Sequence, residues 1–364
     1  MSDDLRNKVL LVCGGRSTEH EISLVSCMSV RKAIDTERYQ PIVAGIARDG
    51  SWKYYGDGEF AVAGSDARQT ALIEDAPACF PVRDGNGAAL LLEDGRRIAF
   101  DIVFPVMHGA FGEDGAIQGF FAMLGVPYVG CDFTASANCM DKALTKTLAK
   151  CVGIPTAGGI VVFSADDPAL DNVPAEYGLP LFVKPAKAGS SVGITRVTEA
   201  GALKAAVTEA LRYDNKVLVE PAVRGREIEC AVLEYPDGRI FAASPGEVIT
   251  HNDFYSYDAK YISAAAATVN PRAELDDALS ARIRETAAKA FRALGCGGLS
   301  RVDFFLTPDG KIILNEINTI PGFTSISLYP QMMANSGVQY AELISILLET
   351  ARSRFEKEKN CAVN

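Results

Sequence analysis

The sequence predicts an α/β domain built on a parallel sheet, followed by two α+β units. The chain has 364 residues, and at about 150 residues per domain this length suggests two or three domains. Over the first 130 residues, β-branched runs alternate with helix-like segments, which is typical of a parallel sheet. Further along, the strand-like runs lie closer together and hairpin turns join several of them. We therefore expect domains over residues 1–130, 131–225 and 226–364.

The net charge and the apolar pattern of the chain argue against two classes of binding partner, nucleic acids and membranes. The 36 Lys and Arg against 46 Asp and Glu give a formal net charge of −10, so the surface would repel nucleic-acid phosphates. No segment approaches the roughly 18 consecutive apolar residues of a membrane helix, and the acidic N-terminus does not resemble a signal peptide. We expect a cytoplasmic protein that binds neither nucleic acid nor membrane.

The nine cysteines are scattered singly, without a C-x-x-C pair. This spacing predicts neither a zinc site nor a disulfide framework, and buried thiols in a reducing cytosol are the expected state. Because the chain has three histidines, a histidine-rich metal site is not expected either.

The first domain begins with a strand, a glycine turn and a helix. An apolar run over residues 8–13 predicts the strand, and Thr18 with Glu21 matches a capping box at the start of the helix. Later elements are expected as strands over 41–47 and 98–107, loops or hairpins over 51–97, and a helix after Gly115. Ligands of parallel sheets lie at the carboxyl ends of the strands, which places Glu19 and His108 at one edge.

The second unit is expected to contain a loop that could cradle phosphate. A helix is predicted over residues 136–152, followed by strands over 159–163, 181–184, 194–197 and 216–220. Lys184 ends one of these strands, and a Gly/Ser loop continues from it to Gly193. Backbone N–H groups of such a loop can point at phosphate oxygens. An ordinary hairpin loop is the alternative, and the P-loop and dinucleotide fingerprints are absent.

The third unit is expected to be a sheet rich in hairpins. Alternation over residues 227–232 predicts a one-sided strand, and residues 299–318 predict a hairpin about a Pro-Asp-Gly turn. Helices are expected over 274–294 and 338–356. The polar and aromatic segment 247–269 has no clear period, and a loop of this length is usually functional or disordered.

Two pairs of polar residues in the final hairpin predict a site for a divalent metal ion. Arg301 and Asp303 lie two apart in one strand, and so do Glu316 and Asn318 in the next, so each pair shares a face. Folding about the turn can bring both pairs together. Proteins hold Mg²⁺ with few carboxylates together with substrate phosphates. The alternative is a solvated sheet face with surface ion pairs.

Several other polar residues are candidates, each with an ordinary structural alternative. Glu220 ends a strand before an extended linker, where it could bind a ribose hydroxyl or simply precede a connection that leads to Glu227. The helix dipole alone explains Glu19 in a first turn. His108 could be a turn residue, and Lys260 with Tyr261 could be loop surface.

Taken together, these segments resemble the D-alanine–D-alanine ligase family of the ATP-grasp superfamily over nearly the whole chain. The motifs that carry the resemblance are, in order, residues 14–24, 108–109, 112–115, 140–142, 184–193, 255–261, 301–303 and 315–319. Each motif is modest alone, but their joint order and spacing are specific.

The resemblance implies a Rossmann-like parallel-sheet domain that binds the first D-alanine, followed by a two-domain ATP-grasp fold that grips ATP. It implies the reaction ATP + 2 D-alanine → D-alanyl-D-alanine + ADP + phosphate, through an acyl phosphate, for peptidoglycan precursor synthesis. Residues 247–269 would act as a lid over the intermediate. A homodimer is implied as well.

The resemblance also implies a role for each candidate residue. Those implied to bind ATP are Lys142, Lys184, Gly189, Ser190, Ser191, Glu220, Glu227 and Phe305. Those implied to bind D-alanine are Glu19, His108, Arg301, Gly322, Ser327 and Leu328. The catalytic set would be Glu19, Ser190, Lys260, Tyr261 and Arg301. Asp303, Glu316 and Asn318 would hold two Mg²⁺ ions, with Mn²⁺ as an alternative metal.

Three competing functions remain open at this point. A D-alanine–D-lactate ligase would form an ester, but Ala259-Lys260-Tyr261 matches the dipeptide-forming members. Another ATP-grasp enzyme would join other substrates, and Glu19 with the tyrosine-rich segment argues against it. A nucleotide-binding regulator without chemistry would not need the intact set of Asp303, Glu316 and Asn318.

Overall fold

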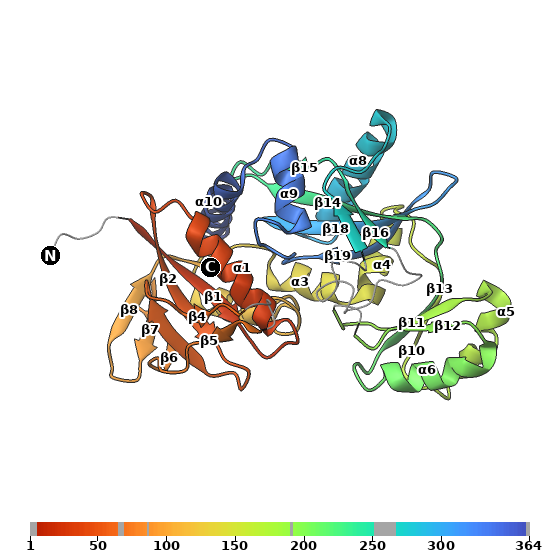
Figure 1. Ribbon diagram of the computed structural model, residues 1–364, viewed down its shortest axis with the longest axis horizontal. Coiled ribbons are helices and arrows are strands. Elements are labelled where there is room, and N and C mark those ends of the chain that lie inside the picture. The colour runs from red at the N-terminus through yellow and green to blue at the C-terminus, as the bar shows by residue number, and fades with distance from the viewer. Residues whose placement is uncertain (1–5, 65–68, 86, 190–191, 251–266, 362–364) are drawn as a thin grey trace.

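The computed structural model describes residues 6–64, 69–85, 87–189, 192–250 and 267–361 (Figure 1). Its three principal sheets follow one another along the chain. The first lies within residues 7–105, the second within 160–221 and the third within 226–318. This order agrees with the α/β beginning and the two α+β units expected from the sequence.

The first sheet is parallel at its centre, as the alternating pattern predicts. Strand β1 pairs in parallel with both β2 and β9, in the order β3-β2-β1-β9. Its elements and the helices beside it are β1 (Asn7–Gly14), α1 (His20–Ala33), β2 (Tyr39–Ile46), β3 (Trp52–Gly56), β9 (Ile102–Pro105) and α2 (Ala116–Leu124). Every β1 residue from Val9 to Cys13 is fully buried, because both faces of the strand are covered.

The segment between β3 and β9 forms hairpins, as expected. Its strands are β4 (Ala61–Val62), β5 (Ala71–Leu72), β6 (Cys79–Asp84), β7 (Gly87–Leu92) and β8 (Arg97–Phe100). The single strand expected over residues 98–107 is therefore wrong, because the chain leaves β8 at Asp101 before β9 begins. The Asp101 carboxylate accepts a hydrogen bond from the Lys8 N–H at 2.7 Å, which fixes this change of sheet.

The capping box expected at α1 is also wrong. Helix α1 has Glu19 at its N-cap without a side-chain capping bond. The Thr18 hydroxyl donates instead to Glu19 Oε2 at 2.8 Å, and Glu21 accepts from Arg48 at 2.6 Å. The Thr18 hydroxyl therefore binds the Glu19 side chain rather than the helix end.

The helix expected over residues 136–152 is two helices, α3 (Phe133–Met140) and α4 (Lys142–Cys151). Asp141 separates them because its carboxylate accepts from the backbone N–H groups of Ala143 and Leu144, as an N-cap does. Both helices pack against the third sheet, where Cys139 and Ala149 join its buried cluster. The break turns Lys142 into the first residue of a helix.

The second sheet is antiparallel and lies in a lobe of its own with α5 and α6 (Figure 1). The strand order is β10-β13-β11-β12. The elements are β10 (Ile160–Val162), α5 (Val173–Tyr177), β11 (Leu181–Pro185), β12 (Thr195–Val197), α6 (Leu203–Ala210) and β13 (Val217–Pro221), with short 3₁₀ turns at Pro168–Asp171 and Ala200–Ala202.

The third sheet runs β17-β16-β14-β18-β19, with β15 paired to β14. Its elements are β14 (Arg226–Glu234), β15 (Ile240–Ala242), β16 (Gly246–Thr250), β17 (Ala267–Asn270), α8 (Asp277–Ala293), β18 (Leu299–Leu306), β19 (Ile312–Asn318), α9 (Leu328–Asn335) and α10 (Tyr340–Lys359). The segment expected to be a long loop over residues 247–269 begins and ends in the paired strands β16 and β17. The sequence pattern did not indicate α9.

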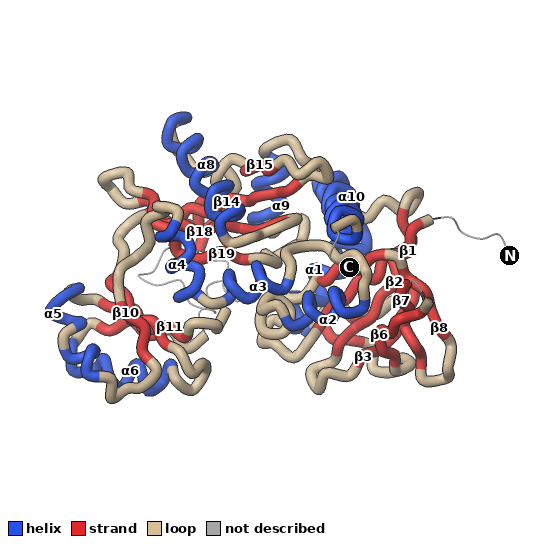
Figure 2. Tube along the Cα trace, turned by 180° about the vertical axis from the view of Figure 1, so that it is seen from behind, coloured by secondary structure: helices blue, strands red, loops and turns tan. Residues whose placement is uncertain are grey.

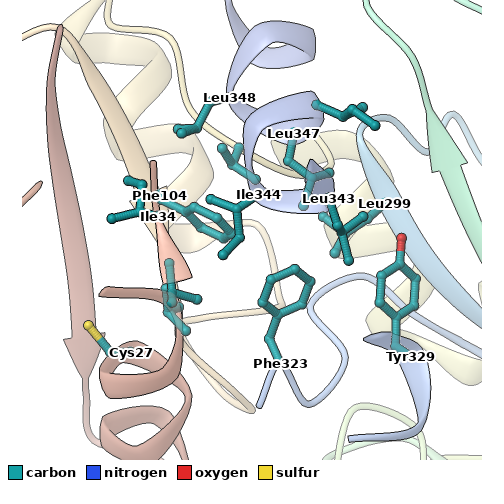
Figure 3. Packing of buried hydrophobic residues seen from close by; sticks show 14 of the residues in the cluster. Cys27, Ile34, Phe104, Leu299, Phe323, Tyr329, Leu343, Ile344, Leu347 and Leu348 are labelled. Atoms are coloured by element: carbon teal, nitrogen blue, oxygen red, sulfur yellow. The ribbon is translucent and has the colours of Figure 1, made fainter. Parts of the chain in front are cut away.

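One hydrophobic core joins the first sheet to the third. Phe104 of β9 and Ile34 after α1 belong to one cluster with Ile344 and Leu347 of α10, and the ring of Phe323 packs against that of Phe104 (Figure 3). Figure 2 shows α10 between these two parts of the molecule. Since Phe323 belongs to the segment before α9, this packing fixes residues 320–328 against the N-terminal domain.

All nine cysteines are free thiols. Among the described residues, no helix combines the length and the apolar composition needed to cross a membrane.

Candidate functional site

A pocket of about 440 Å³ lies where residues from all three parts of the chain meet. It brings together many of the residues singled out in the sequence. The predicted site residues that line it are Glu19, His108, Lys142, Gly189, Arg301, Glu316, Asn318, Gly322, Ser327 and Leu328. The structure therefore brings residues from motifs that are far apart in the sequence to the lining of one pocket.

One side of the site is a sheet face that we call the acidic face: Glu227 and Glu229 on β14, Arg301 and Asp303 on β18, and Glu316 and Asn318 on β19. The strand register places Asp303 opposite both Glu229 and Glu316, and Arg301 opposite Asn318. Alternate residues share a face of a strand, so apolar residues such as Val302 and Ile317 point into the core. The two-residue spacing in the sequence predicts this arrangement.

A β-bulge interrupts the acidic face. The register shifts between Asp303 and Phe304, so that Glu316 pairs with Asp303 while Leu314 pairs with Phe304. Asn315 is the extra residue. Bulges of this kind re-aim neighbouring side chains and are common beside active sites.

Arg301 is the guanidinium at the centre of the acidic face. Its Nε and Nη2 atoms donate to the two Asp303 oxygens at 2.8 and 2.7 Å, and Nε lies 2.9 Å from Glu229 Oε2. Burial alone would lower the pKa of Arg301, but Asp303 and Glu229 raise it well above its usual value. The guanidinium is a fixed positive charge in the pocket wall.

Lys142 connects the acidic face to the Gly/Ser loop. Its Nζ donates to the Ala188 carbonyl at 2.7 Å and lies 3.4 Å from Glu316 Oε2. The side chain is 9% exposed, so its charge acts in a poorly hydrated environment. An ammonium held between a carboxylate and a glycine-rich loop is well placed to bind phosphate oxygens.

A second charged group, which we call the lysine cluster, consists of Lys146, Lys184 and Glu220. The Glu220 carboxylate accepts from Lys146 Nζ at 2.7 Å and lies 3.2 Å from Lys184 Nζ. Burial opposes ionisation of Glu220, but the two lysines overcome it and lower the pKa of its carboxyl. Burial lowers the pKa of Lys146, an effect that Glu220 partly offsets.

Glu19 lies against the backbone of the loop that follows β9. A Cβ at Gly109 would lie 2.3 Å from Glu19 Oε2, and Gly109 has φ +73°, so no larger residue fits there. On the other side, a Cβ at Gly189 would lie 3.5 Å from Glu19 Oε1. The carboxylate therefore sits between the N-terminal domain and the Gly/Ser loop.

His108 is buried and held by both ring nitrogens. Nδ1 lies 2.9 Å from the Ile320 carbonyl and Nε2 lies 3.0 Å from the Ser26 hydroxyl. Because a carbonyl accepts only, Nδ1 carries the proton and Nε2 accepts. Burial lowers the pKa of His108, so the ring is neutral and positions the segment at residue 320.

Glu113 lines the pocket but was given no role from the sequence. It accepts from the Gly109 N–H at 2.8 Å, and its Oε1 is 3.8 Å from His108 Nδ1. Burial raises the pKa of Glu113 to about 8, although the Gly109 bond works in the opposite direction. At neutral pH this carboxyl is largely protonated.

The far end of the pocket is formed by the segment before α9. Ser327 is the N-cap residue of α9, and its hydroxyl lies 2.8 Å from that of Thr324. A Cβ at Gly322 would lie 3.3 Å from Ser327 Oγ. The N-terminus of a helix favours a carboxylate, so Gly322, Ser327 and Leu328 form a suitable site for one.

The remaining predicted residues fall into two groups. Glu227 and Phe305 lie opposite each other on β14 and β18, on the acidic face beyond Asp303. Those that lie outside the described residues are Ser190, Ser191, Lys260 and Tyr261, so their roles stay predictions.

Three residues of the site were missed in the sequence. Lys146 lies four residues after Lys142 and Glu229 lies two after Glu227, so helical and strand periods could have found both. Glu113 was quoted within a motif, but nothing in the sequence indicates that its carboxyl is buried.

The donor set of the acidic face fits Mg²⁺. Asp303, Glu316 and Asn318 offer two carboxylates and one carboxamide, which are hard oxygen ligands. Within the residues that the structure describes, no three His, Cys, Asp or Glu side chains form a metal-binding group on their own. An ion at this face would thus need further oxygens, and triphosphate oxygens beside Lys142 and the Gly/Ser loop are suited to supply them.

Two family models match most of the chain. "D-ala D-ala ligase N-terminus" matches residues 8–131, and "D-ala D-ala ligase C-terminus" matches residues 148–349. The two matches together include every predicted site residue except Lys142, which lies between them.

Curated relatives and solved structures agree with these matches. The chain is 42% identical over 353 residues to D-alanine–D-alanine ligase A of Mesorhizobium japonicum, covering 96% of this chain and 98% of the relative. It is 45% identical over 366 residues to the D-alanine–D-alanine ligase of Mycolicibacterium smegmatis, covering 96% of each. The structure of the Coxiella burnetii D-alanine–D-alanine ligase matches with a TM-score of 0.83 at 35% identity, covering 97% of this chain and 96% of the other.

Proposed function

The chain belongs to the D-alanine–D-alanine ligase family, and on that premise we propose that the pocket joins two D-alanine molecules, converting ATP to ADP and phosphate. The fold is that of the ATP-grasp ligases of this family. The product, D-alanyl-D-alanine, would serve peptidoglycan precursor synthesis. The relatives do not favour ester formation with D-lactate or a regulator without chemistry.

The observation that carries the proposal is the convergence of three kinds of group on one pocket. Glu19 at the N-terminal edge suits an ammonium, Lys142 beside the Gly/Ser loop suits phosphates, and Arg301 in the acidic face suits an oxyanion. An amino acid, a nucleotide triphosphate and an acyl-transfer centre therefore have complementary partners within one 440 Å³ pocket.

The reaction has two bond-making steps. In the first, a carboxylate oxygen of D-alanine attacks the γ-phosphorus of ATP, and the bond from that phosphorus to ADP breaks. The two reactants are both anions, so Lys142 and Lys184 lower the barrier by neutralising the approach. The product of this step is an acyl phosphate.

In the second step, the amine of the second D-alanine attacks the acyl carbon. The carbonyl oxygen gains negative charge next to Arg301, the bond to phosphate breaks, and the nitrogen gives its extra proton to the departing phosphate as the amide forms. Arg301 is preorganised by its two hydrogen bonds to Asp303, so it stabilises the developing charge without first having to reorient.

We propose that Asp303, Glu316 and Asn318 hold two Mg²⁺ ions, with Mn²⁺ as an alternative. A bound divalent ion would supply further neutralisation of the triphosphate charge. The support is the donor chemistry of the acidic face and its position beside Lys142.

Roles are also proposed for residues that lie outside the described part of the structure. Ser190 and Tyr261 would tie the Gly/Ser loop to Glu19, Lys260 would contribute to catalysis, and Ser191 would bind phosphate. The segment 247–269 would exclude water from the acyl phosphate, which is open to hydrolysis. We keep the domain borders proposed at residues 130/131 and 225/226.

We also propose a homodimer in the cytoplasm, where free thiols such as the nine cysteines of this chain stay reduced. An apolar surface on neighbouring helices supports the dimer. Met123 of α2 is 85% exposed and Phe133 of α3 is 51% exposed, and a Cβ at Gly119 of α2 would lie 3.9 Å from Phe133. Sedimentation of the wild-type protein and of Met123→Glu tests this proposal.

The test of the function is phosphate release from ATP, measured with D-alanine, with D-lactate as the second substrate, or with neither. We expect D-alanine to be sufficient for phosphate release, without D-lactate, and one D-alanyl-D-alanine to form for each phosphate released. Equal release without an amino acid would contradict the proposal.

A further inference from the structure

Glu229 is a charged residue of the pocket to which the reaction as described gives no role of its own. It lies on β14, in register with Asp303 of β18, and lines the pocket. Its side chain is 12% exposed, so its charge is costly unless it is compensated. The compensating group is Arg301, whose Nε lies 2.9 Å away.

Arg301 is shared between two carboxylates that have different tasks. Asp303 accepts two bonds from it, at 2.8 and 2.7 Å, yet Asp303 is also proposed to bind Mg²⁺. An aspartate oxygen that ligates a small cation at about 2.0–2.1 Å has less negative charge to offer a guanidinium. Metal binding at Asp303 therefore weakens one of the two anchors of Arg301, while Glu229 keeps the other.

We propose that Glu229 is a positioning residue that holds Arg301 in the pocket wall when Asp303 binds the metal ion. This inference rests on the metal site proposed above. In this role Glu229 has two effects. It keeps the guanidinium aimed at the acyl-transfer centre, and it spares Asp303 from being the main partner of a buried cation.

The charges of the acidic face explain why a second carboxylate is needed here. A guanidinium that is 16% exposed needs a carboxylate partner in such a site. Without Glu229, Arg301 would compete with the metal ion for Asp303. Glu316 is a poor replacement because it is 3.4 Å from Lys142 and belongs to the proposed metal site itself.

The experiment compares Glu229→Gln and Glu229→Asp with the wild-type protein. Gln keeps the size and an acceptor oxygen but removes the charge, whereas Asp keeps the charge but shortens the reach to Arg301. Mn²⁺ binding is measured by electron paramagnetic resonance in the presence of a non-hydrolysable ATP analogue, and kcat and KM are measured with Mg²⁺.

The matched control is Glu234→Gln. Glu234 lies on the same strand β14, its side chain is 17% exposed, and its Oε2 accepts from the Gly298 N–H at 2.9 Å and lies 3.9 Å from Arg354 Nε. It differs from Glu229 in that neither it nor its arginine lines the pocket. The control thus separates the loss of a partly buried carboxylate from β14 from the loss of the carboxylate that contacts Arg301.

For both Glu229 variants we expect about tenfold weaker Mn²⁺ binding and about tenfold lower kcat, a typical cost of losing a residue that orients a metal ligand. The KM for ATP should stay within about twofold, and Glu234→Gln should match the wild-type protein in all three quantities. Thermal unfolding of each variant shows whether it is folded.

Two results would overturn the inference while leaving the metal site intact. One is wild-type Mn²⁺ affinity and kcat in Glu229→Gln. The other is a Glu229→Asp variant with wild-type Mn²⁺ affinity and kcat, together with a Glu229→Gln variant in which both are lowered. That result would mean that a negative charge near Arg301 is sufficient and that contact with Arg301 is not needed. If the wild-type protein binds no Mn²⁺, the metal proposal fails and this inference fails with it.

Discussion

The acidic face and the lysine cluster carry opposite excesses of charge. The acidic face sets one guanidinium, Arg301, among the four carboxylates of Glu227, Glu229, Asp303 and Glu316. The lysine cluster sets one carboxylate, Glu220, between two ammonium groups. Lys142 lies between the two regions and contacts the Gly/Ser loop and Glu316.

This difference indicates how the site divides the recognition of a metal–nucleotide complex. Surplus carboxylates attract a divalent cation, while surplus lysines attract a polyanion, and each region would be costly to bury without its ligand. A magnesium triphosphate carries both charges at once. The pairs within each region keep the empty site stable, and ligand binding exchanges them for contacts with metal and phosphate.

The largest effect is expected from removing the only arginine of the acidic face. Arg301→Ala takes away the group that stabilises the oxyanion, which is worth about 2.7–4 kcal/mol of barrier. We therefore expect kcat to fall by about 100-fold or more, measured as phosphate release with D-alanine and ATP. Near-normal turnover would remove Arg301 from the mechanism.

A smaller effect is expected in the lysine cluster. Lys146→Met leaves Lys184 as the single partner of Glu220, which draws Lys184 away from phosphate. We expect the KM for ATP to rise about tenfold, a change equivalent to about 1.4 kcal/mol, while the KM for D-alanine stays within about twofold.

Lys150→Met is the control for this variant, because Lys150 is an exposed residue one turn further along α4. It removes the same charge from the same helix without touching Glu220. Equal KM values for ATP in Lys146→Met and Lys150→Met would show that the lysine cluster has no part in nucleotide binding.

Glu113 provides a test of burial through the pH dependence of stability. Its pKa is raised to about 8 from 4.5 because it is buried, so the unfolded chain releases this proton first as the pH rises. The free energy of unfolding should fall between pH 4.5 and 8, by up to about 1.4 kcal/mol per pH unit. Glu113→Gln should flatten this slope in urea titrations, and Glu93→Gln, at an exposed position, should not. Parallel curves for both variants would contradict the buried state of Glu113.

The smallest effect is expected for a charge pair far from the pocket. Arg97 and Asp84 form an ion pair of 3.1 Å between side chains that are 50% and 42% exposed. Pairs in water contribute less than about 1 kcal/mol, so Arg97→Ala should leave kcat unchanged and lower the free energy of unfolding by no more than that. A larger loss of unfolding free energy in urea would contradict the view that burial makes the charge pairs of the site stronger than exposed pairs.

The sequence was sufficient for the parts of the site that follow a short period. Arg301, Asp303, Glu316 and Asn318 could be placed on one face because alternate strand residues share a side, and the hairpin turn set their pairing. The parallel sheet likewise placed Glu19 and His108 at one edge. Such rules work because they depend on backbone geometry alone.

The remaining features depend on contacts between distant segments. Asp141 ends α3 by capping α4, and Asp101 breaks an apolar run by binding the Lys8 backbone, neither of which periodicity reveals. The capping box failed because Thr18 and Glu21 bind Glu19 and Arg48 instead. Burial of Glu113 and the sharing of Arg301 by Glu229 and Asp303 arise only when the three parts pack together.

The most direct test of the account is a crystal structure with a non-hydrolysable ATP analogue and Mg²⁺. We predict metal ions within about 2.0–2.1 Å of oxygens of Asp303, Glu316 and Asn318, triphosphate oxygens on Lys142 and Lys184, and Arg301 retained by Glu229. Asp303 still bound to Arg301 through both oxygens, with no ion between the strands, would contradict it.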